Sequence, residues 1–153
     1  MWNIKQILLS AILVIFLDDS SGLSAEEYKA VLLTARKYCN ESQVDPATLT
    51  MIRETEIIKD RDMITPEATC FLDCILKRTG LVINDKLEVE SVIEVINHIG
   101  YNEEHQRIGV ETVTKCDAKR KIMPGKCNAG QYFKDCEHEF SQDLSFLHII
   151  LRT

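Results

Sequence analysis

The sequence predicts an all-α domain held together by three disulfides, and two observations lead to this expectation. The chain has 153 residues and six cysteines, an even number, all downstream of an apolar N-terminal segment typical of secreted proteins. Further along, apolar residues recur every three or four positions, which is the period of a helix that buries one face. Cys70 and Cys74 lie in one such stretch and share a helix face, so each must bond a cysteine elsewhere.

The first 25 residues are predicted to be a signal peptide. A lysine lies near the start, residues 7–17 form an apolar run, and small residues follow. That run rises only about 16 Å as a helix, roughly half of a bilayer's hydrocarbon core, so no stable membrane insertion is expected. We expect cleavage after Ala25, with cuts after Gly22 or Ser24 as open alternatives. The protein is therefore expected to be secreted and extracellular.

Residues 26–153 are expected to form one domain. A chain of this size buries roughly two-thirds of its unfolded surface, and no second domain fits. The formal net charge is −6 for the whole sequence. Removing Lys5, Asp18 and Asp19 with the signal peptide leaves 17 basic and 22 acidic residues, a net charge of −5. This acidic balance argues against nucleic acid and anionic membranes as partners.

The first two helices are predicted by their N-terminal signals. Ser24 and Glu27 have the spacing of a capping box, and apolar residues at helical spacing continue to Cys39. Asp45 is followed directly by a proline, which is favoured at the first position of a helix. A short second helix is therefore expected to run to about Arg53.

A third helix is expected to begin after Thr65, which is again followed by proline, and to end near Gly80. Its apolar surface is wide, so we expect this helix to be central. Residues 81–85 are predicted to form a turn with an apolar flank. The face of the third helix that should point inward carries Cys70, Phe71, Cys74 and Ile75.

Three more helices are predicted in the second half of the chain. Apolar residues at helical spacing over 89–99 indicate the fourth, closed by Gly100. Asn102 is a candidate cap for the fifth, which we expect to run to Cys116. The sixth is expected after 123–125, and it carries Cys127, Tyr132, Phe133, Cys136 and Phe140.

The C-terminal tail, residues 141–153, is too apolar to be left in water. It is expected to pack on the domain or into a cavity within it. The residues that make it apolar are Leu144, Phe146, Leu147, Ile149, Ile150 and Leu151.

The cysteine spacing resembles that of the insect odorant-binding protein family, which includes the pheromone-binding and general odorant-binding proteins. Three residues separate the second and third cysteines and eight separate the fifth and sixth, while the other intervals are 30, 41 and 10 residues. The resemblance covers nearly the whole mature chain. Sequence alone leaves fifteen pairings open. The resemblance implies the interlocked pairing Cys39–Cys74, Cys70–Cys127 and Cys116–Cys136.

The resemblance also implies a function, namely transport in olfaction. Such a protein binds small hydrophobic odorants or pheromones in a central cavity and carries them through aqueous extracellular fluid. It makes and breaks no bond, so we expect no enzyme and no cofactor. A volatile hydrophobic ligand is the expected partner, and an odorant receptor or a second copy of the chain are further candidates. The candidate lining residues are Met51, Ile52, Phe71, Ile75, Val92, Ile96, Ile108, Tyr132 and Phe133, with Phe146 and Ile150 of the tail as a wall or lid.

The sequence favours neither zinc binding nor catalysis. Cys70 and Cys74 present two thiols on one helix face, but the sequence has no pair of histidines at the spacing of a zinc site. The expected compartment is oxidising, which favours disulfides over a metal site. No serine-hydrolase elbow, metalloprotease motif or phosphate-binding loop occurs, so no catalytic residues are assigned.

The alternative function belongs to a different class. A secreted protein of the same fold would bind a protein partner, or would scavenge small amines in saliva or venom. A protein partner needs an exposed apolar patch, which the tail would supply. An amine site needs a buried carboxylate and aromatic side chains, and the aromatic content of 7% argues against one.

Overall fold

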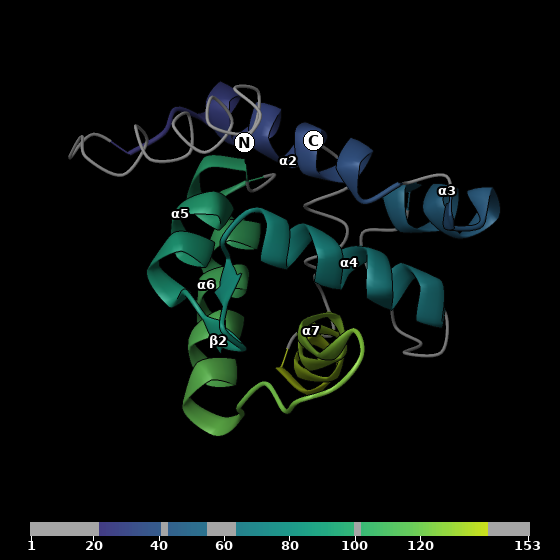
Figure 1. Ribbon diagram of the computed structural model, residues 1–153. Helices are drawn as coiled ribbons and strands as arrows, with labels where there is room; N and C mark the ends of the chain where they lie inside the picture. The colour runs from purple at the N-terminus through teal and green to yellow at the C-terminus, as the bar shows by residue number, and fades with distance from the viewer. Residues whose placement is uncertain (1–21, 41–42, 55–63, 100–101, 141–153) are drawn as a thin grey trace, which may run out of the picture.

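The computed structural model describes residues 22–40, 43–54, 64–99 and 102–140. Over these residues the fold is all-α, as the sequence predicts, with six helices and one very short hairpin. Figure 1 shows them in chain order from purple to yellow. The elements are α2 (Ala25–Tyr38), α3 (Pro46–Glu54), α4 (Pro66–Arg78), β1 (Val82–Ile83), β2 (Lys86–Leu87), α5 (Val89–Ile99), α6 (Glu103–Lys119) and α7 (Asn128–Phe140).

The predicted caps set the ends of α2 and α4. The hydroxyl of Ser24 accepts a hydrogen bond from the Glu27 backbone N–H, and the Glu27 carboxylate accepts one from the Ser24 N–H, so the capping box is complete. Thr65 caps α4 by accepting from the Ala68 N–H. Gly80 follows α4 with φ +74°, the left-handed conformation expected of a glycine at this position.

The turn predicted over residues 81–85 is present, but it is part of an antiparallel hairpin that was not predicted. Val82 pairs with Leu87 and Ile83 with Lys86. The two residues between the strands, Asn84 and Asp85, have φ values of 50° and 57°, so the turn has the positive φ angles of a type I′ hairpin. Two-residue strands carry too little alternation to be recognised in a sequence.

Two helix boundaries also differ from those expected. The fifth predicted helix, α6, continues past Cys116 to Lys119, one further turn. The sixth, α7, begins at Asn128, so Cys127 lies just outside it. Cys127 has φ +55°, which is incompatible with a right-handed helix and is tolerated because this residue makes the bend into α7.

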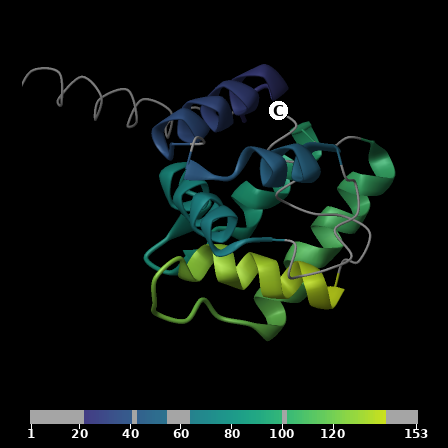
Figure 2. The same cartoon turned by 90° about the vertical axis from the view of Figure 1, so that its right-hand side faces the viewer.

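Helix α4 lies at the centre of the arrangement, as its wide apolar surface predicts. It packs against α7 on one side and against α2 on the other, while α5 and α6 form a second pair beside it. Figure 1 shows α2 running above α4 and α7 seen end-on below it, and Figure 2 shows α4 and α7 side by side from a second direction. The disulfides and the core described below lie between these helices.

Candidate functional site

All six cysteines form disulfides, and the pairing implied by the family resemblance is confirmed. Cys39–Cys74 joins the end of α2 to α4, with 5.8 Å between the Cα atoms. Cys70–Cys127 joins α4 to the start of α7, with 4.8 Å between the Cα atoms. Cys116–Cys136 joins α6 to α7. Each bridge has at least one cysteine inside the sequence loop of another, so α2, α4, α6 and α7 are covalently interlocked.

Five of the predicted lining residues meet in one buried apolar cluster between α4, α5 and α7. Each of them is at most 4% exposed. They belong to a single contiguous core, which their helical spacing in the sequence predicts. These residues are Phe71, Ile75, Val92, Ile96 and Phe133.

Apart from Tyr132, the other predicted lining residues are partly buried or lie outside the described residues. Met51 on α3 is partly buried and packs against the core. Ile108 on α6 is partly buried. Ile52 is part of α3, but its side chain lies outside the described residues, as do Phe146 and Ile150 of the tail. The expectation that residues 141–153 pack onto the domain is therefore not addressed by this structure.

Tyr132 is also buried, at 6% exposure, and its ring packs edge-on against Phe133 with the ring centroids 5.5 Å apart. Its hydroxyl is buried without a hydrogen-bond partner. Burial, together with the negative charge of Asp117, raises the pKa of Tyr132 to about 12. The phenol is therefore protonated at neutral pH and is able to donate a hydrogen bond.

Tyr132 forms part of the wall of a surface pocket that we call the loop pocket. It has a volume of about 460 Å³ and lies where the segment 120–127 connects α6 to α7. Figure 1 shows this connection as the pale green loop below α7. Its walls include Arg120, Lys121, Met123, Pro124, Lys126, Gln131, Tyr132 and Asp135.

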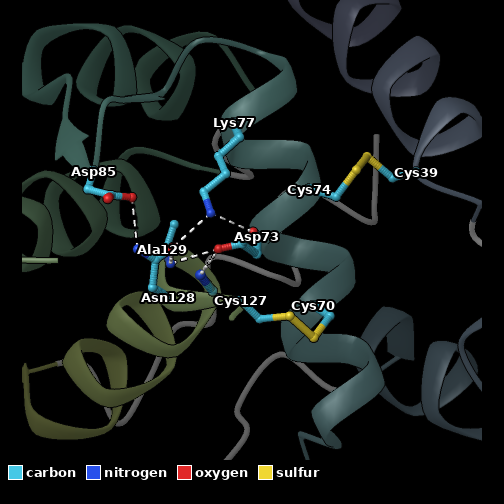
Figure 3. A network of polar contacts seen from close by, with 10 residues as sticks. Cys39, Cys70, Asp73, Cys74, Lys77, Asp85, Cys127, Asn128 and Ala129 are labelled. Atoms are coloured by element: carbon cyan, nitrogen blue, oxygen red, sulfur yellow. Dashed lines mark hydrogen bonds and ion pairs between the residues drawn. A yellow bond between two sulfur atoms is a disulfide. The ribbon is translucent and has the colours of Figure 1, made fainter. Parts of the chain in front are cut away.

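Asp73 is a buried carboxylate that the sequence analysis did not single out. It lies on α4 at 8% exposure and accepts hydrogen bonds from the N–H groups of Ala129, at 2.7 Å, and Gly130, at 3.2 Å. These are N–H groups of the first turn of α7, which its own preceding residue, Cys127, does not cap. A carboxylate at this end of a helix also interacts favourably with the helix dipole. Asp73 therefore caps α7 from another helix (Figure 3).

A lysine and an amide complete the network around Asp73. Lys77 lies 3.0 Å from the second oxygen of Asp73 and donates to the side-chain oxygen of Asn128 at 2.7 Å. Asn128 donates to Asp85 of the hairpin turn at 2.8 Å. Figure 3 shows these contacts beside the Cys70–Cys127 bridge. They join α4, the hairpin and α7 at one point, so this network supports the frame and offers no free group for chemistry.

Gly130 allows α4 and α7 to approach closely at the same point. A β-carbon added to Gly130 would lie 2.0 Å from the carbonyl oxygen of Thr69, which is far inside van der Waals contact. Only glycine fits this helix position. The sequence shows a glycine within a helical stretch, Gly130, and an acidic residue, Asp73, next to Cys74. Neither residue by itself indicates which part of the chain it contacts.

A second polar contact joins α2 to α5. The Tyr28 hydroxyl donates to the Glu94 carboxylate at 2.6 Å, and its ring lies 5.0 Å from that of His98. Burial and the hydrogen bond to Glu94 raise the pKa of Tyr28 to about 12. The Nδ1 atom of His98 lies 2.8 Å from the backbone carbonyl oxygen of Glu94, and it donates a hydrogen bond there in the tautomer that carries its proton on Nδ1.

The part of the chain that the structure describes contains no group of three or more histidine, cysteine or acidic side chains able to hold a metal ion. Within the same residues, no helix is both long enough and apolar enough to cross a membrane.

A model of the PBP/GOBP family matches residues 23–139, from just before α2 almost to the end of α7. The chain belongs to the PBP/GOBP family. The family resemblance inferred from the cysteine spacing is thereby confirmed. Neither the curated proteins nor the solved structures that were compared contain a match to the chain.

The PBP/GOBP family consists of small secreted carriers of odorants and pheromones and is not a family of enzymes. The match includes every cysteine and all of the described helices except the last residue of α7. The three disulfides and the central helix α4 of this PBP/GOBP protein all lie within the matched region.

Proposed function

We propose that this PBP/GOBP protein is a secreted carrier that binds one small hydrophobic molecule inside the helical domain and transports it through extracellular fluid. The observation that supports this most directly is the family match over 23–139 together with the interlocked disulfides. The function requires no bond to be made or broken, so we propose that the protein is not an enzyme and uses no cofactor.

The disulfides support a carrier function for a physical reason. In the chain-entropy model, each bridge stabilises the fold by roughly 3–4 kcal/mol, although interlocked bridges do not add simply. An apolar cavity removes contacts from the core and lowers stability. A frame stabilised by covalent bonds tolerates that loss, and the Asp73 network adds to the frame at the α4–α7 junction.

The ligand we propose is uncharged or weakly polar, with about ten carbon atoms. Transfer of such a chain from water gains on the order of 8 kcal/mol, of which several kcal/mol are lost on immobilisation, so micromolar affinity is expected. The proposed contacts are the buried cluster of α4, α5 and α7 together with Met51, which packs against the same apolar core. Ile52, Ile108, Phe146 and Ile150 remain proposed contacts of the same site.

The direct test is displacement of an uncharged lipophilic fluorescent probe from the oxidised protein by alkyl alcohols and esters of increasing chain length. Native mass spectrometry of the same samples gives the stoichiometry. We expect one probe per chain and tighter displacement as the alkyl chain lengthens, because more apolar area is buried. Absence of probe uptake across the panel would contradict the carrier function.

A matched pair of variants on α3 locates the site. Met51 is partly buried against the core, whereas its neighbour Thr50 is exposed. We expect Met51→Gln to weaken ligand binding by about tenfold, because it places an amide against the apolar ligand. Thr50→Gln changes the same helix on its solvent side and should leave affinity unchanged. Equal affinities for both variants would place the ligand elsewhere.

The alternative function, a protein-binding role or amine scavenging, has less support. An amine site needs an available buried carboxylate. The carboxylate of Asp73 is already occupied by two backbone N–H groups and Lys77. Association of the chain with itself or with a protein, combined with failure to take up the probe, would favour the protein-binding role. Receptor binding and dimerisation stay within the proposal as later steps of transport.

A further inference from the structure

The loop pocket is chemically different from the apolar core, although Tyr132 touches both. Its walls carry three cationic side chains, Arg120, Lys121 and Lys126, and one acidic side chain, Asp135. The chain as a whole has a net charge of −6, so the pocket is locally positive on an acidic protein. A locally positive concave surface attracts anions.

The charges of the loop pocket are not equally available. The guanidinium of Arg120 donates to the Glu139 carboxylate, with 3.2 Å from its Nε. Asp135 accepts a hydrogen bond from the Gln131 amide at 2.9 Å. Lys121 and Lys126, by contrast, are exposed and make no ion pair with any other residue that the structure describes. Two ammonium groups are therefore free to meet a negatively charged group.

The Tyr132 hydroxyl is the second, independent observation. A buried hydroxyl without a partner loses its hydrogen bonds to water and gains none in return, so such groups are rare in folded proteins. Tyr132 is only 6% exposed and lines the pocket. Its hydroxyl has no hydrogen-bond partner. An acceptor oxygen delivered by a ligand would satisfy it once a flexible lining side chain moves aside.

The pocket also has an apolar part. Met123 is 71% exposed, one of the large apolar side chains that the fold leaves in water, and Pro124 follows it. An exposed apolar group beside cationic groups matches a ligand that has both an alkyl chain and an anionic end. Inorganic anions would use the charges but not this surface.

We propose that the loop pocket binds a small organic carboxylate at a second site, separate from the carrier site. Lys121 and Lys126 meet the carboxylate, the Tyr132 hydroxyl donates to it, and the alkyl part lies against Met123. This inference does not depend on the carrier function, because none of the proposed carrier contacts except Tyr132 belongs to the loop pocket.

The test is a titration of the oxidised, isotope-labelled protein with hexanoate, followed by backbone amide chemical shifts. Hexanol is the uncharged control of equal chain length, and acetate is the charged control without a chain. We expect hexanoate to shift the amides of 121–126 and 131–135 with about millimolar affinity, weakening as salt is added. Hexanol and acetate should shift these amides less.

Variants separate the two proposed contacts. The double variant Lys121→Gln and Lys126→Gln should weaken hexanoate binding by about fivefold or more, because it removes both free charges. Tyr132→Phe keeps the ring and removes only the hydroxyl, and should weaken binding by about fivefold. The matched control changes two lysines of α2, which contributes no residue to the pocket, Lys29→Gln and Lys37→Gln, and should alter affinity less than about twofold.

Four results would overturn the proposal. The first is the absence of hexanoate-dependent shifts at the loop pocket, and the second is an equal response to hexanol, which would make the site merely apolar. The third is unchanged affinity in the pocket lysine variant, which remains informative even if Tyr132→Phe fails to fold. The fourth is binding that acetate reproduces, which would indicate an adventitious ion only. Probe displacement from the carrier site is measured separately, so either proposal can fail alone.

Discussion

At Gly130 the backbone of α7 comes so close to α4 that a methyl group has no room. The obstructing atom is a backbone carbonyl oxygen, that of Thr69, which cannot turn away as a side chain does. The Asp73 hydrogen bonds to Ala129 and Gly130 hold the helices in this position. One glycine therefore sets the distance between the two helices that share the Cys70–Cys127 bridge.

We expect Gly130→Ala to lower the free energy of unfolding by about 2–3 kcal/mol, because α7 must shift away from α4. In an open helix the same change would stabilise by about 1 kcal/mol, since alanine has the higher helix propensity. Urea denaturation of the oxidised protein measures the difference.

The neighbouring exposed residue provides the control for this variant. Gln131→Ala changes α7 at a position that points to solvent, and should alter stability by less than about 0.5 kcal/mol. A Gly130→Ala variant as stable as the Gln131→Ala variant would show that α4 and α7 are free to separate.

Individual core residues were predictable to a large extent, and polar contacts were not. Phe71, Ile75, Val92 and Ile96 follow helical spacing, so their burial could be expected from the sequence. The partners of Asp73 lie 56 and 57 positions away, and this separation leaves no local pattern. The orphaned hydroxyl of Tyr132 has the same origin, because only packing decides whether a buried tyrosine finds a partner.

Among the elements, helix starts were predicted more reliably than helix ends and turns. Caps such as Ser24 and Thr65 act within three residues and are readable in the sequence. The end of α6 and the start of α7 depend instead on where Cys116, Cys127 and Cys136 are joined to other helices. The hairpin was missed because each of its strands has only two residues.

The cap of α2 bears on where the proposed signal peptide ends. A cut after Ala25 or Ser24 would remove the capping box, and a cut after Gly22 keeps it. A cut after Gly22 also keeps Leu23, which packs against the core and is the first residue of the family match. Gly22 and the serine two positions before it are the small residues that signal peptidase prefers at such a site.

We therefore predict that the secreted protein begins with Leu23. Intact mass measurement and N-terminal sequencing of protein recovered from the medium of expressing cells test this directly. A protein beginning with Ala25 or Glu26 would contradict it, and an unprocessed protein that stays inside the cell would contradict secretion itself. Ser24→Ala should lower stability by about 1 kcal/mol in the mature protein, which shows separately whether the cap acts there.

For the whole molecule, the bridges should differ in what they contribute. Cys116–Cys136 closes the shortest loop, with a sequence separation of 20, and Cys70–Cys127 the longest, with 57. In the chain-entropy model, replacing Cys116 and Cys136 by serine lowers the free energy of unfolding by about 3 kcal/mol, and replacing Cys70 and Cys127 lowers it by about 4 kcal/mol.

Thermal or urea unfolding of the two double-serine variants measures these losses. We expect both proteins to remain helical, with the Cys70–Cys127 variant the less stable, because it also releases the start of α7 from α4. The opposite order would mean that strain or residual structure, not loop closure, governs the contribution of the bridges.

The interlocked bridges also limit how far apart distant residues of the oxidised chain can move when it unfolds. A covalent route from Cys39 to Cys136 crosses the first bridge to Cys74, goes back four residues to Cys70, crosses to Cys127, goes back eleven to Cys116, and crosses again. Stretched out, these two short backbone segments span only about 50 Å. However harsh the denaturant, Cys39 and Cys136 of the oxidised chain cannot separate by more than this tether and its three bridges, so the unfolded oxidised chain is more compact than the reduced one.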